Sequence, residues 1–166
     1  MMKRILKVLI IAPTAIIIVT FVLFVLLFTL TPIVHNLTLN SFAKQLDNCP
    51  LPAKTELIEK ESVCGKLNGN GDGMDYFACI LIKSDLSLDG VESYYKKCKF
   101  RPAKNRKDYL VDVKIKRVNS EILDDELVEH RDIQFSNLKS VKDYSKYFVV
   151  LIYDGGYPAG LDFRGC

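Results

Sequence analysis

An uncharged apolar run from Val8 to Val34 constrains this chain more than any other feature of its sequence. Roughly 20 apolar residues in a helix cross the hydrocarbon core of a bilayer, and this run is longer. Three cations, Lys3, Arg4 and Lys7, stand directly before it. Residues 8–34 are therefore predicted to form a transmembrane helix that follows a basic N-terminus, residues 1–7.

An apolar run of this kind has two other interpretations. A buried core helix is disfavoured, because a small domain cannot cover a helix that is apolar on all sides. A cleaved secretory signal, which would release a secreted protein, is the alternative. Signal h-regions are roughly 7–15 residues long and end at a small-x-small site. The run's end, Leu30–Val34, contains no such site, so the pattern favours an uncleaved signal-anchor.

The flanking charges predict the orientation of this helix. Three cations precede the run, whereas the first cation after it is Lys44. The positive-inside rule then keeps the N-terminus in the cytoplasm and places residues 35–166 outside. We expect a single-pass protein of the cell membrane with an extracytoplasmic C-terminal domain.

The composition of that domain excludes several classes of function. Of the 23 Lys and Arg residues three precede the run, so the 20 that follow it equal the 20 Asp and Glu residues. A neutral domain argues against nucleic-acid binding, which needs a basic face. All five cysteines lie beyond the run, as expected in an oxidising compartment, and because their number is odd at least one thiol is free or pairs with another chain. Their spacings match no zinc site, and we expect no metal and no cofactor.

Residues 35–53 are predicted to form a juxtamembrane stalk, with a short helix at Ser41–Leu46 and an extended segment at Cys49–Pro52. Residues 54–166 are then one domain. It opens with two β-like runs, Thr55–Leu67 and Met74–Lys83, which flank the turn residues Asn68–Gly73. Asn-Gly supplies the positive φ angles of tight hairpin turns, so the two runs are predicted to pair as a hairpin.

The register of that hairpin has two candidates. Aligning the apolar residues of the two strands requires opposed residue numbers whose sum is odd. A turn at Asn70-Gly71 meets this requirement and sets Val63 opposite Ala78. A second register also meets it; this one would set Cys64 opposite Cys79 and allow a Cys64–Cys79 disulfide. The sequence leaves both registers open.

The remaining elements complete an α+β domain. A helix is predicted from Leu88 to Cys98 with Ser87 as its N-cap, and it is expected to cover the second strand, which is apolar on both faces. Further strands are predicted at Lys107–Val118, at 126–136 and at Tyr147–Tyr153, whose continuous apolar side chains indicate a central strand. The order β-β-α-β-β-β predicts an antiparallel sheet with one packed helix.

Patterns that could carry catalysis or metal chemistry are weak. The loop at 68–73 begins like a calcium-binding EF-hand loop, but Cys79 stands where the bidentate glutamate belongs. His35 adjoins the membrane segment, and His130 lies in a charged stretch where histidine is usually solvated. No catalytic residue is assigned, and we expect a protein that is not an enzyme. A cell-envelope enzyme that uses a cysteine or a carboxylate is the alternative.

One group of cations is concentrated between the predicted helix and the next strand. We call it the cationic stretch: Lys96, Lys97, Lys99, Arg101, Lys104, Arg106 and Lys107. Such a group could bind anionic lipid headgroups or wall polymers outside the cell. The usual interpretation of such a group is a solvated loop after a helix, balanced here by the acids Glu121, Asp124, Asp125, Glu126, Glu129 and Asp132.

Three sequence stretches carry a resemblance. LNGNGDGMDYFACILIKSDLS (67–87), the following SYYKK (93–97) and the terminal GLDFRGC (160–166) resemble a pattern of small single-pass membrane proteins of Gram-positive bacteria. The resemblance implies a bacterial plasma-membrane location and no activity. The sequence thus predicts a membrane-anchored binding domain, whose partner is an anionic envelope component or another membrane protein.

Overall fold

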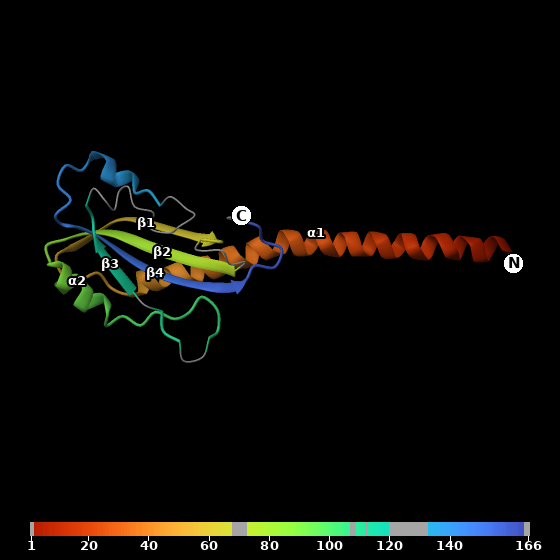
Figure 1. Ribbon diagram of the computed structural model, residues 1–166, viewed down its shortest axis with the longest axis horizontal. Helices are drawn as coiled ribbons and strands as arrows, with labels where there is room; N and C mark the ends of the chain where they lie inside the picture. The colour runs from red at the N-terminus through yellow and green to blue at the C-terminus, as the bar shows by residue number, and fades with distance from the viewer. Residues whose placement is uncertain (1, 68–72, 107–108, 112, 120–132, 165–166) are drawn as a thin grey trace.

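The computed structural model describes residues 2–67, 73–106, 109–111, 113–119 and 133–164, and for residues 2–10 the course of the backbone alone. A long helix, α1 (Met2–Asn48), leads into an antiparallel sheet and extends from it as a bare rod (Figure 1). The sheet consists of β1 (Thr55–Gly65), β2 (Gly73–Ser84), β3 (Val113–Arg117) and β4 (Tyr147–Pro158), in the spatial order β1-β2-β4-β3. The other helices are α2 (Leu88–Tyr95) and a 3-10 helix, η1 (Ser136–Ser140). The α+β fold is confirmed.

Helix α1 changes character along its length. The described side chains from Ile11 to Leu30 are exposed on every side of the helix, and this part is long and apolar enough to span a membrane. From His35 onward a single stripe is buried: His35, Leu39, Phe42 and Leu46. Their spacing of three or four residues places them on one helix face, which packs against β1 and β2.

The structure differs from the stalk expected at residues 35–53. The helix does not end near Val34 but continues to Asn48, with Pro13 and Pro32 inside it. An extended segment begins only at Pro50. Burial of Phe42 and Leu46 against the sheet provides the physical reason, because tertiary packing stabilises helix that local signals leave undecided.

Both faces of the sheet are covered, as the apolar pattern of β2 predicts. Even-numbered residues of β2, Met74 to Ile82, face α1 and α2 in the larger cluster of buried side chains. Odd-numbered residues of β2, such as Phe77 and Leu81, face the segment that contains Phe135 and Leu138 of η1. Helix α2 therefore shares a face with α1, and η1 with its flanking residues covers the other.

The hairpin register matches neither candidate. Val63 lies opposite Phe77 and Cys64 opposite Tyr76, and the register shifts by one residue at Ile58. An alternating pattern fixes register only where one face is polar, and β2 is buried on both faces. As a consequence Cys64 faces α1 while Cys79 lies on the opposite side of the sheet, so a Cys64–Cys79 disulfide is excluded.

A disulfide instead joins Cys49, directly after α1, to Cys98, after α2, with 6.1 Å between their Cα atoms. No local pattern pointed to this pair, because the two cysteines come from the ends of different helices. The bond ties the end of α1 that is farthest from its exposed rod to the loop that follows α2. Together with the buried stripe it fixes α1 to the domain.

The other predicted elements stand as follows. Helix α2 begins as expected, with the Ser87 Oγ accepting a hydrogen bond from the Gly90 N–H at 3.2 Å, and it ends at Tyr95. The strand at Tyr147 is central, as predicted, and extends to Pro158. Of the strand expected at 107–118, the described residues form β3 at Val113–Arg117. Most of the strand expected at 126–136 falls outside the described residues, and residues 133–135 are irregular.

Truncation of a buried α1 side chain tests whether residues 35–48 belong to the domain core. We expect Phe42→Ala, at a side chain that is 1% exposed, to lower the free energy of unfolding by about 3–5 kcal/mol, because it removes a buried ring. Leu37→Ala, on the same helix but 64% exposed, should change it by less than about 0.5 kcal/mol. Urea unfolding in a mild detergent measures both. Equal effects would show that this part of α1 does not pack on the sheet.

Removal of the disulfide is the second test of the fold. Cys49 and Cys98 are separated by 49 positions, so the double variant Cys49→Ala/Cys98→Ala should lose about 4 kcal/mol through the larger entropy of its unfolded chain. Thermal unfolding with and without dithiothreitol measures the loss. The reductant should lower the Tm of the wild type and leave the Tm of the double variant unchanged. A wild-type Tm that does not respond to reduction would contradict the pairing.

Candidate functional site

The candidate site is formed by residues 101–106, 109 and 110, which we call the cationic loop and which include Arg101, Lys104 and Arg106 of the cationic stretch. Its two ends are joined, because Phe100 and Val111 form a bridge in which the Val111 N–H donates to the Phe100 carbonyl at 3.2 Å. Gln45 of α1 holds the start of the loop. Its Oε1 accepts from the Arg101 N–H at 2.7 Å, and its Nε2 donates to the Arg101 carbonyl at 2.9 Å.

The end of β4 holds the middle of the cationic loop. Asp154, whose side chain is 1% exposed, accepts a hydrogen bond from the Ala103 N–H at 2.8 Å. Its Oδ1 has no hydrogen-bond donor among the described residues, and Nη1 of Arg106 lies 3.7 Å away. Nη2 of Arg106 donates to the Gly155 carbonyl at 2.9 Å. Arg106 therefore neutralises a buried carboxylate.

Tyrosine rings support the two central cations. The Arg106 guanidinium lies 4.4 Å from the centre of the Tyr157 ring, and the Lys104 Nζ lies 5.6 Å from the same ring and 5.9 Å from the Tyr76 ring. Cations over aromatic faces gain electrostatic attraction without an acidic partner. Burial and a hydrogen bond to Asp154 raise the pKa of Tyr157 to about 12, so this ring stays neutral beneath the cations.

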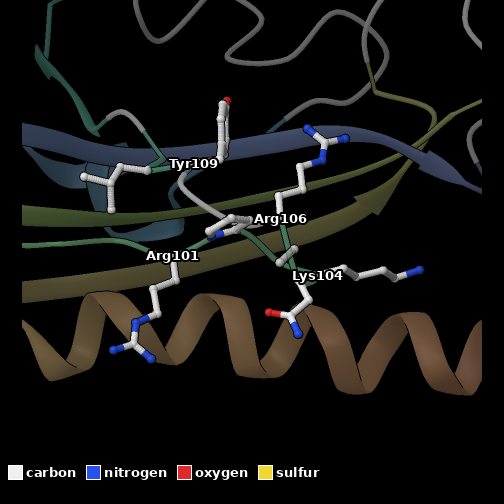
Figure 2. Close-up of a pocket in the computed structure, with 8 residues that line it drawn as sticks. Arg101, Lys104, Arg106 and Tyr109 are labelled. Carbon is white, nitrogen blue, oxygen red and sulfur yellow. The ribbon is translucent and has the colours of Figure 1, made fainter.

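The cationic loop encloses an open cavity of about 550 Å³. Its lining combines cations with apolar and aromatic side chains: Arg101, Pro102, Ala103, Lys104, Asn105, Arg106, Tyr109 and Leu110. Figure 2 shows Arg101, Lys104 and Arg106 leaving the loop in three different directions. The charges do not converge on one point, so the arrangement suits an extended array of anionic groups better than a single small anion.

The loop lies near the end of the domain from which the rod of α1 emerges. Tyr76, whose ring lies below Lys104, is hydrogen-bonded to α1: its hydroxyl oxygen lies 2.5 Å from Nδ1 of His35. His35 directly follows the uncharged run. If α1 spans a bilayer, Lys104 is held close to its surface.

Other members of the cationic stretch lie apart from this cavity. Lys96 forms an ion pair with Glu92, one helical turn earlier, at 2.9 Å. Lys97 is exposed, and Lys99 lines a neighbouring cavity of about 370 Å³ beside the disulfide. Lys107 lies outside the described residues, as do the six acidic residues between 121 and 132 that would balance the cationic stretch.

Groups that could support catalysis are poorly placed in the described part of the chain. The Cys79 thiol is buried, and desolvation raises its pKa far above the usual range, which disfavours a reactive thiolate. Cys64 is also buried. Among the described residues no three His, Cys, Asp or Glu side chains gather as a metal site would require. His130 lies outside those residues.

Sequence reasoning found the cations but missed the residues that fix them. Asp154 gave a usable signal, because a carboxylate directly follows the apolar run Tyr147–Tyr153 of a central strand. A charge in such a place is usually paired. The sequence carries no signal for Tyr157 or Gln45, because their roles depend on how α1 and β4 pack against the cationic loop.

Comparison with known proteins adds no relative. No protein-family model matches the chain, and neither a curated protein nor a solved structure matches it. The contacts and charges described above are therefore the basis for an inference about function.

A double-mutant cycle tests the pairing of Arg106 with Asp154. We expect Arg106→Gln to lower the free energy of unfolding by about 1–3 kcal/mol, because it leaves a buried carboxylate without its cation. Asp154→Asn in the same chain should restore part of that loss, since the amide oxygen still accepts from Ala103. Urea unfolding of the wild type, both single variants and the double variant gives the coupling free energy between Arg106 and Asp154. Additive losses would mean that the two side chains do not interact.

Proposed function

We propose that this protein is a single-pass membrane protein whose C-terminal domain lies outside the cytoplasm and binds rather than transforms its partner. The partner is a phosphate-rich array at the membrane surface, either lipid headgroups or an anionic envelope polymer. One observation carries the proposal: the cationic loop is held by Gln45 of α1 and lies over Tyr76, which is hydrogen-bonded to His35 of α1, and its cations extend in different directions over an open cavity.

Several contacts support an uncleaved anchor. The C-terminal segment reaches back to α1 within the apolar run, where the Phe163 ring lies 6.1 Å from the Phe28 ring and Nη2 of Arg164 donates to the Pro32 carbonyl at 3.3 Å. Cleavage near residue 34 would remove these partners. The backbone there is also continuous α-helix, whereas a peptidase needs an extended substrate segment.

The Cys49–Cys98 disulfide supports an extracytoplasmic location, because such bonds persist in oxidising compartments. It agrees with the orientation that Lys3, Arg4 and Lys7 predict. The buried thiol of Cys79 supports binding over catalysis, since a nucleophilic cysteine needs exposure and a lowered pKa.

The length of α1 supports the membrane surface as the place of binding. About 20 residues from Val8 onward cross the hydrocarbon core, which places Phe28 at its far boundary. His35, which is hydrogen-bonded to Tyr76 below Lys104, lies seven positions beyond Phe28, or about 10 Å along the helix. The headgroup layer is several ångströms thick on each side of the hydrocarbon core. A loop at this height can reach phosphate groups of the bilayer or of polymers attached to it.

A charge-removal variant tests the proposal. Lys99→Gln/Arg101→Gln/Lys104→Gln removes two cations of the cationic loop together with the neighbouring Lys99, and it keeps Arg106, which neutralises Asp154. Each cation near an anionic surface contributes about 1 kcal/mol, so we expect binding to weaken about a hundredfold. The full chain is held in phosphatidylcholine nanodiscs, and its binding to phosphatidylglycerol vesicles and to soluble polyglycerol phosphate is measured at low salt.

The control removes the same charge elsewhere: Lys114→Gln/Lys139→Gln/Lys142→Gln changes three exposed cations outside the cationic loop. Binding of this variant should stay within a few fold of the wild type. Preference for vesicles would identify lipid headgroups, and preference for the soluble polymer would identify an envelope polymer. If both triple variants bind equally weakly, the loss of binding depends on net charge alone, and the proposed role of the loop is wrong.

A further inference from the structure

After β4 the chain turns back to α1 and lies beside it at the point where the helix leaves the sheet (Figure 1). We call residues 159–164 the C-terminal segment. It approaches the helix closely at Gly160, whose φ of +61° favours glycine. A Cβ atom at Gly160 would lie 3.3 Å from Cγ2 of Thr31, so a larger residue would push the segment away from α1.

Arg164 fastens the C-terminal segment to the helix. Its guanidinium donates to the Pro32 carbonyl at 3.3 Å and to Oδ1 of Asn36. Asp162, which is 1% exposed, holds the guanidinium in place, with Nε of Arg164 2.9 Å from Oδ1 and Nη2 2.5 Å from Oδ2. The buried ion pair lowers the pKa of Asp162 and raises that of Arg164. The position of the segment on α1 is therefore well determined.

This fastening leaves one large apolar side chain outside the domain. Phe163 is 59% exposed, and its ring centre lies 6.1 Å from that of Phe28, which is 46% exposed. Phe28 belongs to the uncharged run, so both rings lie against one continuous apolar surface formed by α1. Beginning at Val8, about 20 residues cross the hydrocarbon core, which places Phe28 at its far boundary. Aromatic side chains are enriched at that depth.

We propose that Phe163 inserts among the lipids of the leaflet next to the domain and forms a second membrane contact beside α1. The occupant of this exposed apolar site is lipid, because the site is continuous with the lipid-facing surface of the helix. Phe163 thereby fixes the height and rotation of the domain on the bilayer, and with them the position of the cationic loop. The inference depends on the proposed membrane span of α1 and not on an anionic partner.

The absence of tryptophan from the chain allows a direct test with single-tryptophan variants. Phe163→Trp reports on the proposed site, and its exposure makes the substitution compatible with folding. Leu51→Trp, 38% exposed beyond the distal end of α1, is the control in water. Leu23→Trp, 55% exposed in the middle of the run, reports on the span itself. Each full-length variant is reconstituted in phosphatidylcholine nanodiscs.

Tryptophan emission is then measured with lipids brominated at shallow or deep acyl carbons, and with the soluble quencher acrylamide. We expect Phe163→Trp to emit at shorter wavelength than Leu51→Trp and to lose intensity most with shallow bromines. Leu23→Trp should lose intensity most with deep bromines. Emission from Phe163→Trp that matches Leu51→Trp and responds only to acrylamide would overturn the inference.

The three positions separate two kinds of failure. Deep quenching at residue 23 with aqueous emission at residue 163 would overturn the lipid contact and leave the span of α1 intact. Aqueous emission at both positions would overturn the lipid contact and the span together. A further variant, Arg164→Gln in the Phe163→Trp chain, releases the segment from α1, and it should broaden the depth profile if the guanidinium positions the ring. An unchanged profile would contradict that positioning.

Discussion

The packing of one stripe of α1 on the sheet is the contact on which the rest of this structure depends. Leu39, Phe42 and Leu46 are buried against β1 and β2, while the same helix from Ile11 to Leu30 exposes apolar side chains on every side. The helix is continuous between the two halves, and the contacts of Arg164 and Gly160 brace it at Pro32, where one backbone hydrogen bond is missing. The orientation of the exposed rod therefore determines the orientation of the domain, as a flexible stalk would not.

This rigidity explains why so many contacts gather where α1 leaves the sheet. The bond between His35 and Tyr76, the guanidinium of Arg164 on Asn36 and the approach of Gly160 to Thr31 all lie within about two helical turns. Each is a polar or close backbone contact that tolerates little displacement. At the other end of the packed stripe, the Cys49–Cys98 disulfide holds the helix covalently. The junction is fixed from both directions.

The sequence predicted those parts of the fold whose signals are local. Ser87 begins α2 because its side chain caps the helix, and the apolar run at Tyr147 marks a central strand in any arrangement of the sheet. The hairpin register was not predictable, because β2 is apolar on both faces and a slip exposes nothing. The continuation of α1 was readable from the spacing of Leu39, Phe42 and Leu46, but Pro32 and the end of the uncharged run suggested a boundary there.

The cationic loop shows the same division between what composition reveals and what the fold decides. Counting cations treats Lys96 and Arg106 as equal members of one group, yet Lys96 pairs with Glu92 and Arg106 with the buried Asp154. Their charges are largely compensated within the domain. Among the described residues no acidic side chain pairs with Lys104 or Arg101; tyrosine rings lie beside the Lys104 ammonium, and Gln45 holds the Arg101 backbone. The charge available to a partner is therefore smaller than the sequence suggests, but it is held at a fixed place beside α1.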